Sequence, residues 1–190
     1  MKPVLLISGA AALSAALAAV PAQANLLANG GFESPVLAPA SYLNITVGNE
    51  PAGFGWTVFD TGVDVFSNGV LGTGIVASGG VQALDLVGFG STGGLRQSFA
   101  TTAGTSYQLS FNYANNAIST GNAAASVIVN DGAATLLSTS VSHSSSTTGS
   151  ANWTGFSANF TGTGHVVTLS FDTTLGGEIG RASCRERVCT

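Results

Sequence analysis

Charge and cysteine are both scarce in this 190-residue chain, and much of what there is lies at the C-terminal end. Between Asn25 and Gly177 there are seven acidic residues and a single basic one, Arg96, so this segment has a net charge of −6. A surface without a basic patch cannot neutralise phosphate groups, which argues against nucleic acid and anionic membranes as partners. The segment also lacks cysteine, so no disulfide supports it, and its solubility must come from Ser, Thr, Asn and Gly.

The one long apolar run is at the N-terminus, where Met1-Lys2-Pro3 is followed by VLLISGAAALSAALAAV and then by PAQA. A short basic start, an apolar run and an A-x-A site are typical of a secretory signal peptide. We therefore predict that residues 1–24 are a signal peptide and that the mature chain starts at Asn25. A membrane anchor is the alternative, but the run is short and rich in alanine for a membrane span.

Proline is absent after Pro51, and the chain there consists of short β-rich runs separated by Gly, Asn and Ser. In the run SYQLSFNYA (106–114), Tyr107, Leu109 and Phe111 alternate with polar residues, which predicts a strand with one buried face and one solvated face. No segment after the signal peptide shows helical periodicity over three turns. The pattern therefore predicts an all-β antiparallel sandwich in one domain, residues 25–177.

Turn signals place the connections between these strands. Asp131-Gly132 lies between two apolar runs, which predicts a hairpin. Residues 34–55 hold the three prolines of the mature chain, and residues 140–152 are rich in Ser and Thr. We expect both of these segments to be long surface loops, with His143 solvated in the second.

Residues suited to catalysis are few. The sequence GFGSTG (88–93) matches a dinucleotide-binding pattern, but a strand-like run follows it rather than the required helix. Asp60 and Asp64 are the closest acids in sequence, and along an extended strand they would lie about 13 Å apart, too far for two-carboxylate hydrolysis. His143 and His165 lack the spacing of a zinc site. We therefore predict that the protein is not an enzyme.

Three side chains are candidates for binding a neutral, hydroxyl-rich ligand. Trp56 and Trp153 could each stack on the apolar face of a sugar ring, or could pack in the core, the second being favoured for Trp56. Arg96 is expected on the polar face of its strand, where it either pairs with Asp85 or Asp64 or binds ligand oxygens.

A family resemblance starts at NLLANGGFESP (25–35), which resembles the opening of galactose-binding-like jelly rolls, a group that includes many carbohydrate-binding modules. The runs that follow, among them GVQALDLVGFGSTGGLRQSF and GTSYQLSFNYANN, resemble in order family 642 of the domains of unknown function. The match covers 25–171 and is most specific over 83–116. Bacterial chains that resemble this one are exported proteins of the PEP-CTERM sorting class. Plant cell-wall proteins with the same domain are also similar, which implies association with polysaccharide rather than catalysis.

The resemblance also implies a structural calcium ion where the first strand of the jelly roll meets the last. Glu33 stands at the matching N-terminal position, and its partner would be an aspartate on the final strand. The chain departs from the family at that point, because EIGRASCRERV follows where the final strand should begin. That segment resembles translated sequencing adapter. We therefore interpret residues 178–190 as a non-native tail, and we expect the final strand and any sorting anchor behind it to be missing. The sheet edge that the final strand would have covered should then be prone to association.

The sequence thus predicts a non-catalytic, exported or cell-surface module that binds or organises extracellular polysaccharide or exopolysaccharide. A structural matrix protein without a specific sugar site is the alternative, and a glycan-active enzyme is a third. The residues expected to bind carbohydrate are Arg96, Gln108, Asn112 and Trp153, with Glu33 as a calcium ligand. We expect Arg96, Gln108, Ser110 and Asn112 to share one solvent-facing surface. We expect no nucleic acid as a partner. We expect contact with a membrane only through the missing C-terminal anchor.

Overall fold

The computed structural model of the chain describes residues 25–72, 75–88, 90, 92–116 and 121–175. The ten strands in this part of the chain are β1 (Tyr42–Ile45), β2 (Thr57–Asp60), β3 (Val63–Ser67), β4 (Gln82–Asp85), β5 (Gly93–Ala100), β6 (Ser106–Tyr113), β7 (Ala123–Asn130), β8 (Thr135–His143), β9 (Thr154–Thr161) and β10 (Val166–Thr173). Among these residues there is no helix with the length and apolar character that a membrane crossing requires. The predicted signal peptide (1–24) and tail (178–190) lie outside the described residues, and both stay predictions.

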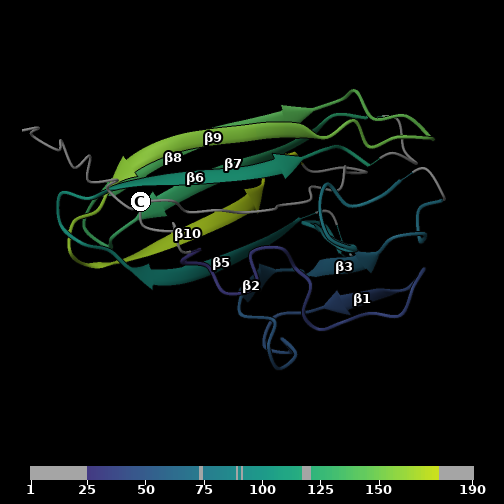
Figure 1. Cartoon of the computed structure of the whole chain (residues 1–190), viewed down its shortest axis with the longest axis horizontal. Helices are drawn as coiled ribbons and strands as arrows, with labels where there is room; N and C mark the ends of the chain where they lie inside the picture. The colour runs from purple at the N-terminus through teal and green to yellow at the C-terminus, as the bar shows by residue number, and fades with distance from the viewer. Residues whose placement is uncertain (1–24, 73–74, 89, 91, 117–120, 176–190) are drawn as a thin grey trace, which may run out of the picture.

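The strands form three antiparallel sheets arranged as a sandwich (Figure 1). The largest sheet has five strands in the order β2-β5-β10-β7-β8, and the pair β6-β9 lies across from it. A three-stranded sheet, β1-β3-β4, lies at one end of the molecule, where β3 contacts β5. The predicted all-β antiparallel sandwich is therefore confirmed.

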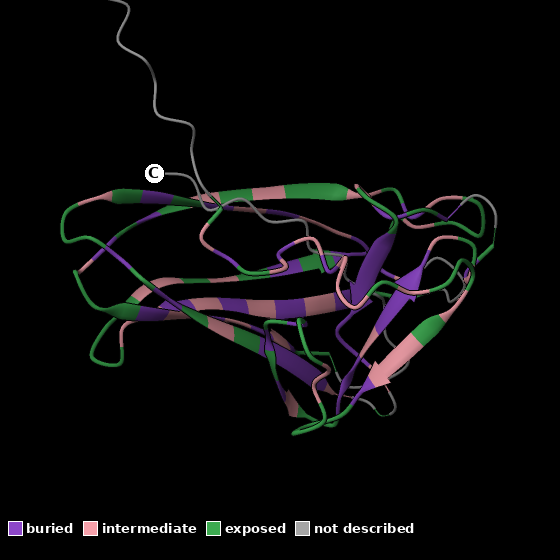
Figure 2. Cartoon of the chain, turned by 60° about the horizontal axis from the view of Figure 1, so that its bottom comes forward, coloured by how far each residue is buried: buried purple, intermediate pink, exposed green. Residues whose placement is uncertain are grey.

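The alternation of apolar and polar residues determines which face of each long strand is buried (Figure 2). In β6, Tyr107, Leu109 and Phe111 are buried and the intervening side chains face solvent, as the sequence predicts. In β10, which belongs to the opposite layer, Val167, Leu169 and Phe171 are the buried residues. The core lies between the two layers.

Aromatic contacts join the two layers. Phe171 of β10 meets Phe111 of β6 edge to face, with ring centres 5.1 Å apart. Trp56, just before β2, lies 6.2 Å from Phe171 and 5.6 Å from Phe32. Trp56 is 3% exposed, so the interpretation of Trp56 as a core residue is confirmed.

One prediction about the connections between strands is confirmed, and two are corrected. Asp131 caps the β7–β8 hairpin, because its Oδ1 accepts the N–H groups of Ala133 and Ala134. The predicted loop 34–55 contains a short strand, β1, which pairs with β3. The prediction of a solvated His143 is wrong: the strand β8 extends through His143, whose ring is 7% exposed.

Candidate functional site

The outer surface of the five-stranded sheet, here called the five-stranded face, consists mainly of small hydroxyl-bearing side chains. Each lies on the side of its strand opposite a buried residue. The central members of this face are Thr57, Phe59, Arg96, Ser98, Ser126, Ile128, Asn130, Ser138, Ser140, Thr168, Ser170 and Asp172. Within this set there is one aromatic ring, one cation and one acid.

Strand register arranges these side chains in rows that cross all five strands. One row runs Phe59, Gly94, Asp172, Ser126, Ser140, and the next runs Thr57, Arg96, Ser170, Ile128, Ser138. Neighbouring strands lie about 4.8 Å apart, so each row is about 19 Å long. Such a row offers hydroxyl groups to an extended ligand laid across the strands.

Phe59 lies flat at one end of the first row because its neighbour has no side chain. A Cβ at Gly94 would overlap Cε2 and Cζ of the Phe59 ring, so the ring rests on the backbone of β5. The Arg96 guanidinium carbon is 6.0 Å from the ring centre, at the outer limit of a cation–π contact. The ring is only half-buried, which leaves part of it available for stacking.

Sequence reasoning missed Phe59, although a signal was present. In Thr57-Val58-Phe59, alternation that buries Val58 must turn Phe59 outward, and Val58 is 1% exposed. The sequence could therefore have predicted an outward aromatic ring on a polar sheet surface. It could not have predicted that Phe59 lies next to Arg96, because that depends on the pairing of β2 with β5.

Two acidic residues lie near the Phe59 ring. Asp172 occupies the same row on β10, and Asp60 follows Phe59 at the end of β2 with a positive φ of 60°. Burial raises the pKa of Asp172, and the negative charge of Asp60 and the hydrogen bond to it raise that pKa further.

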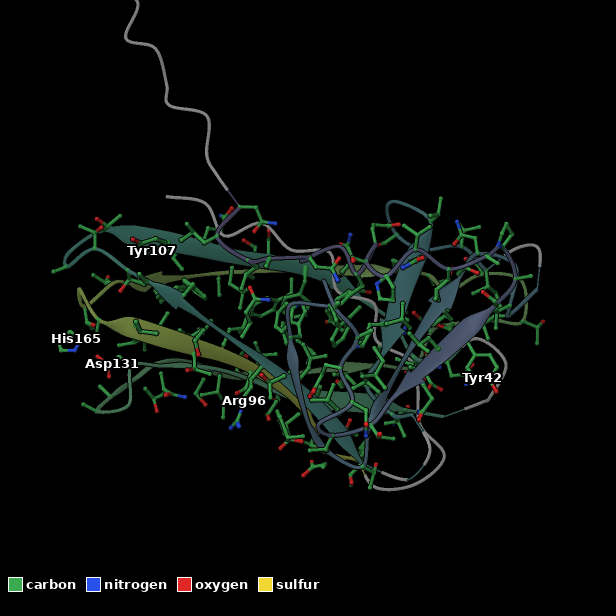
Figure 3. All side chains as sticks on the ribbon, turned by 90° about the horizontal axis from the view of Figure 1, so that it is seen from below. Tyr42, Arg96, Tyr107, Asp131 and His165 are labelled. Atoms are coloured by element: carbon green, nitrogen blue, oxygen red, sulfur yellow. The ribbon has the colours of Figure 1, made fainter. Side chains whose placement is uncertain are left out.

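The structure does not bring the predicted carbohydrate-binding residues together. Arg96 is exposed on β5 and points away from the molecule (Figure 3). Gln108 and Asn112 face outward from β6, in the opposite layer, next to Asn159 and Gly155 of β9. The expected common surface of Arg96, Gln108, Ser110 and Asn112 therefore does not form.

Arg96 also does not pair as the structural alternative expects. Asp64 and Asp85 face one another across β3 and β4 in the three-stranded sheet, and Asp85 is buried. Within the described residues the contact of Arg96 is the Phe59 ring. Of the two alternatives, the geometry favours the one in which the guanidinium is available to a ligand.

Trp153 occupies a third location. It is half-buried against a small cluster that includes Phe66 and Ile75, and its indole Nε1 donates a hydrogen bond of 2.9 Å to the Val76 carbonyl. Part of its surface is therefore used in packing. Carbohydrate binding by Trp153 stays a prediction, at a position separate from the five-stranded face.

One serine, histidine and asparagine come together in the manner of a hydrolase triad. Ser145 Oγ lies 3.0 Å from His143 Nε2, and His143 Nδ1 lies 2.6 Å from Asn115 Oδ1. A catalytic base needs a lone pair facing the serine. Nε2, however, lies 2.9 Å from the backbone carbonyl of Asn152, which can only accept, and Nδ1 accepts the backbone N–H of Asn115 at 3.0 Å. These two contacts favour the tautomer with its proton on Nε2, which has no lone pair there for Ser145. The set therefore fastens the loop after β8 rather than activating Ser145.

Glu33 holds the N-terminal segment against the three-stranded sheet. Its Oε1 accepts the N–H groups of Val81 and Gln82, at 2.9 and 3.3 Å. Gln82 completes the attachment, because its side-chain amide donates to the carbonyls of Phe32 and Pro35. These contacts give the Glu33 carboxylate a structural role without a metal.

Calcium takes six to eight oxygen ligands, from carboxylates and carbonyls. Among the described residues, Glu33 belongs to no group of three or more His, Cys, Asp or Glu side chains that could hold a metal. The partner aspartate that the resemblance implies falls outside the described residues, so calcium binding stays a prediction.

Comparison with solved structures supports the fold. TmCBM61, solved in complex with β-1,4-galactotriose, is similar at a TM-score of 0.55 and 20% sequence identity, covering 87% of this chain and 97% of its own. A xylan-binding domain, CBM22-1 of Paenibacillus barcinonensis Xyn10C, has a TM-score of 0.46 and 15% identity, covering 80% of this chain and 94% of its own. A family 35 carbohydrate-binding module from Clostridium thermocellum has a TM-score of 0.44 and 13% identity, covering 77% and 95%. A search of the curated proteins found no match.

A family comparison agrees with the resemblance seen in the sequence. The model of the protein family of unknown function DUF642 matches residues 25–180, which include every strand described above. The match covers most of the chain and starts where the mature protein is predicted to start. This chain therefore belongs to the DUF642 family.

Proposed function

We propose that this protein is a non-catalytic, exported module that binds polysaccharide on its five-stranded face. One observation carries the proposal: the half-exposed Phe59 ring lies flat on Gly94, beside a guanidinium and a carboxyl, at the end of a row that continues with Ser126 and Ser140. An aromatic face suits the apolar C–H face of a sugar ring, and charged groups at its edge bind the sugar hydroxyls. Export is supported by the predicted signal peptide.

The length of the row suggests how a chain-like ligand would lie. A polysaccharide segment placed along Phe59, Asp172, Ser126 and Ser140 crosses all five strands and contacts four of them through a side chain. Only the Phe59 end offers stacking. We therefore expect a sugar at Phe59 to contribute most of the affinity and those further along the row to add to it.

Titration of the purified protein with soluble glycans tests the proposal. An array of neutral plant and bacterial polysaccharides first identifies a ligand, and isothermal titration then compares Phe59→Ala with wild type. Loss of the stacking contact should weaken binding about tenfold or more. Tyr42→Ala is the matched control, because Tyr42 is an exposed aromatic side chain on β1, outside the five-stranded face.

Two outcomes would contradict the proposal. Retention of full affinity by Phe59→Ala together with loss in Trp153→Ala would move the site to the position that the sequence predicts. Failure of every glycan to bind the wild-type protein would favour the alternative function, a matrix protein without a specific sugar site.

A further inference from the structure

The five-stranded sheet has two outer margins, β2 and β8, and the chain protects only the first of them (Figure 1). Natural proteins usually blunt a sheet edge with a short strand, a charge or a proline. The strand β2 is four residues long and ends at Asp60, and Glu50 Oε1 accepts the Val58 N–H at 2.8 Å. The strand β8 is nine residues long and contains no proline, acid, lysine or arginine. Among the described residues, no strand pairs with its outer edge.

Strand pairing shows which backbone groups of β8 are left at this margin. The Thr174 N–H donates to the Ala124 carbonyl, so the even-numbered residues of β7 direct their N–H and C=O groups toward β10. The odd-numbered residues of β7 therefore hydrogen-bond to β8, where the register opposes them to Leu137, Thr139 and Val141. The residues of β8 whose N–H and C=O groups point away from the sheet are consequently Ser138, Ser140 and Ser142.

The core is also incompletely covered along the β8 side of the sandwich. In the inner strands β7 and β10, the inward side chains are all buried. In β8, by contrast, the inward Leu137 and Thr139 are only half-buried. The strand β9 contacts β8 from the other layer and shows the same pattern, with Phe156 and Ala158 half-buried. This side of the sandwich therefore retains apolar surface that a neighbouring molecule would cover.

We propose that β8 is a homodimer interface, at which the β8 strands of two copies of this chain pair antiparallel about a two-fold axis at Ser140. A two-fold interface must be complementary to itself. The strand β8 meets this condition because it brings no like charges together, although the segment 25–177 has a net charge of −6. Ser140 is the middle one of the three outward residues, so it pairs with the partner's Ser140, and Ser138 pairs with the partner's Ser142.

The dimer joins the five-stranded faces of its two copies. Paired residues of antiparallel strands place their side chains on the same face, so the first row continues through Ser140 into the sheet of the partner copy. With ten strands about 4.8 Å apart, the joined row is about 43 Å long, and a Phe59 ring lies at each end. The binding of one long polysaccharide at both rings rests on the proposed function, whereas the dimer itself does not.

Proline substitution tests the interface without removing a hydrogen bond from the sheet. Ser140→Pro removes an N–H group that points away from β7, and proline is tolerated at such edge positions. Ser140→Ala is the matched control, because it removes the hydroxyl group and keeps the N–H. Sedimentation velocity over a range of concentrations should show dimers for the wild type and for Ser140→Ala. For Ser140→Pro we expect a dissociation constant about tenfold higher or more.

A second variant keeps the test decisive if Ser140→Pro does not fold, as judged by circular dichroism and a melting curve. Ser140→Lys keeps the backbone N–H and places two like charges at the two-fold axis, so its dimer should also weaken about tenfold and recover partly in high salt. A wild type that stays monomeric up to its highest soluble concentration overturns the proposal. So does a dimer whose strength is unchanged in Ser140→Lys or in folded Ser140→Pro, because the copies then associate through another surface.

Glycan binding separates this inference from the proposed function. Phe59→Ala should dimerise as the wild type does, because Phe59 lies on the opposite margin of the sheet. A dimer that Ser140→Pro dissociates supports the interface even if no glycan binds and the proposed function fails. If both hold, a long glycan should bind the wild type severalfold more tightly than Ser140→Pro, and a trisaccharide should bind both alike. Equal affinity of the two proteins for the long glycan overturns the joined row and leaves the interface standing.

Discussion

At the scale of single residues, burial assigns different roles to aromatic side chains that look alike in the sequence. Trp56 and Phe59 are three positions apart, yet Trp56 packs against Phe32 and Phe171 whereas the Phe59 side chain lies on the outer face of the sheet. The larger ring is the one that stabilises the core, where burying an aromatic side chain contributes about 2–3 kcal/mol. The smaller one costs less to expose and is therefore better placed to meet a ligand.

The partial burial of Asp172 leads to a prediction about stability. The pKa of Asp172 is raised above its ordinary value of 3.8 in the folded state. Folding therefore favours the protonated carboxyl, and the resulting stability is fully present below pH 3.8 and is lost as the pH rises through the raised pKa. Asp172→Asn cannot ionise, so we expect its melting temperature to exceed that of the wild type by about 2 °C or more at pH 7.

The measurement is thermal unfolding at several pH values, followed by circular dichroism. Below pH 3.8 the advantage of Asp172→Asn should disappear, because the wild-type carboxyl is then protonated in both states. A variant that is less stable than the wild type at pH 7 would contradict the prediction.

At the scale of elements, Glu33 and Gln82 attach an irregular N-terminal segment to the start of β4. Glu33→Ala removes the acceptor for two N–H groups, which should destabilise the protein by about 1–3 kcal/mol and lower its melting temperature by several degrees. If N–H anchoring is the role of Glu33, the decrease should be the same in calcium and in a chelator. A wild-type melting temperature that rises with calcium, and a Glu33→Gln variant that loses the rise, would instead support the metal that the family resemblance implies.

The individual strands could be predicted from local sequence, and their arrangement could not. Alternation over 106–113 gives β6 and its buried face, and Asp131-Gly132 gives the β7–β8 hairpin. Both signals are short-range. The strand β1 was missed because YLNI is short and lies between prolines, and its pairing with β3 supplies the stability that its own sequence lacks.

The candidate site was missed for the same reason. Phe59 and Asp172 are far apart in sequence, and they share a row only because β5 pairs with β2 on one side and with β10 on the other. Arg96 was correctly expected on a polar face, since alternation in LRQSFA requires it. Its grouping with Gln108 failed because alternation determines the face of a strand, not the layer in which that strand lies.

At the scale of the whole molecule, the sandwich has two polar outer surfaces. The five-stranded face differs from the other surface in its rows of side chains, the first of which begins at Phe59. The surface of β6 and β9 carries Gln108, Asn112 and Asn159 and has no outward aromatic ring among its described residues. If a polysaccharide chain follows the first row of the five-stranded face, an obstruction midway along that row should affect long ligands more than short ones.

Ser126→Met and Ser157→Met test this directly. Both replace a strand serine by a longer, unbranched side chain, Ser126 next to Asp172 in the first row and Ser157 on the β6–β9 surface. We expect Ser126→Met to remove the gain in affinity on going from a trisaccharide to longer oligosaccharides, a loss of severalfold, and to leave the trisaccharide bound at Phe59. Ser157→Met should match the wild type at every length. If Ser157→Met weakens binding and Ser126→Met does not, the ligand lies on the β6–β9 surface, where the sequence places Gln108 and Asn112, and the five-stranded face is not the site.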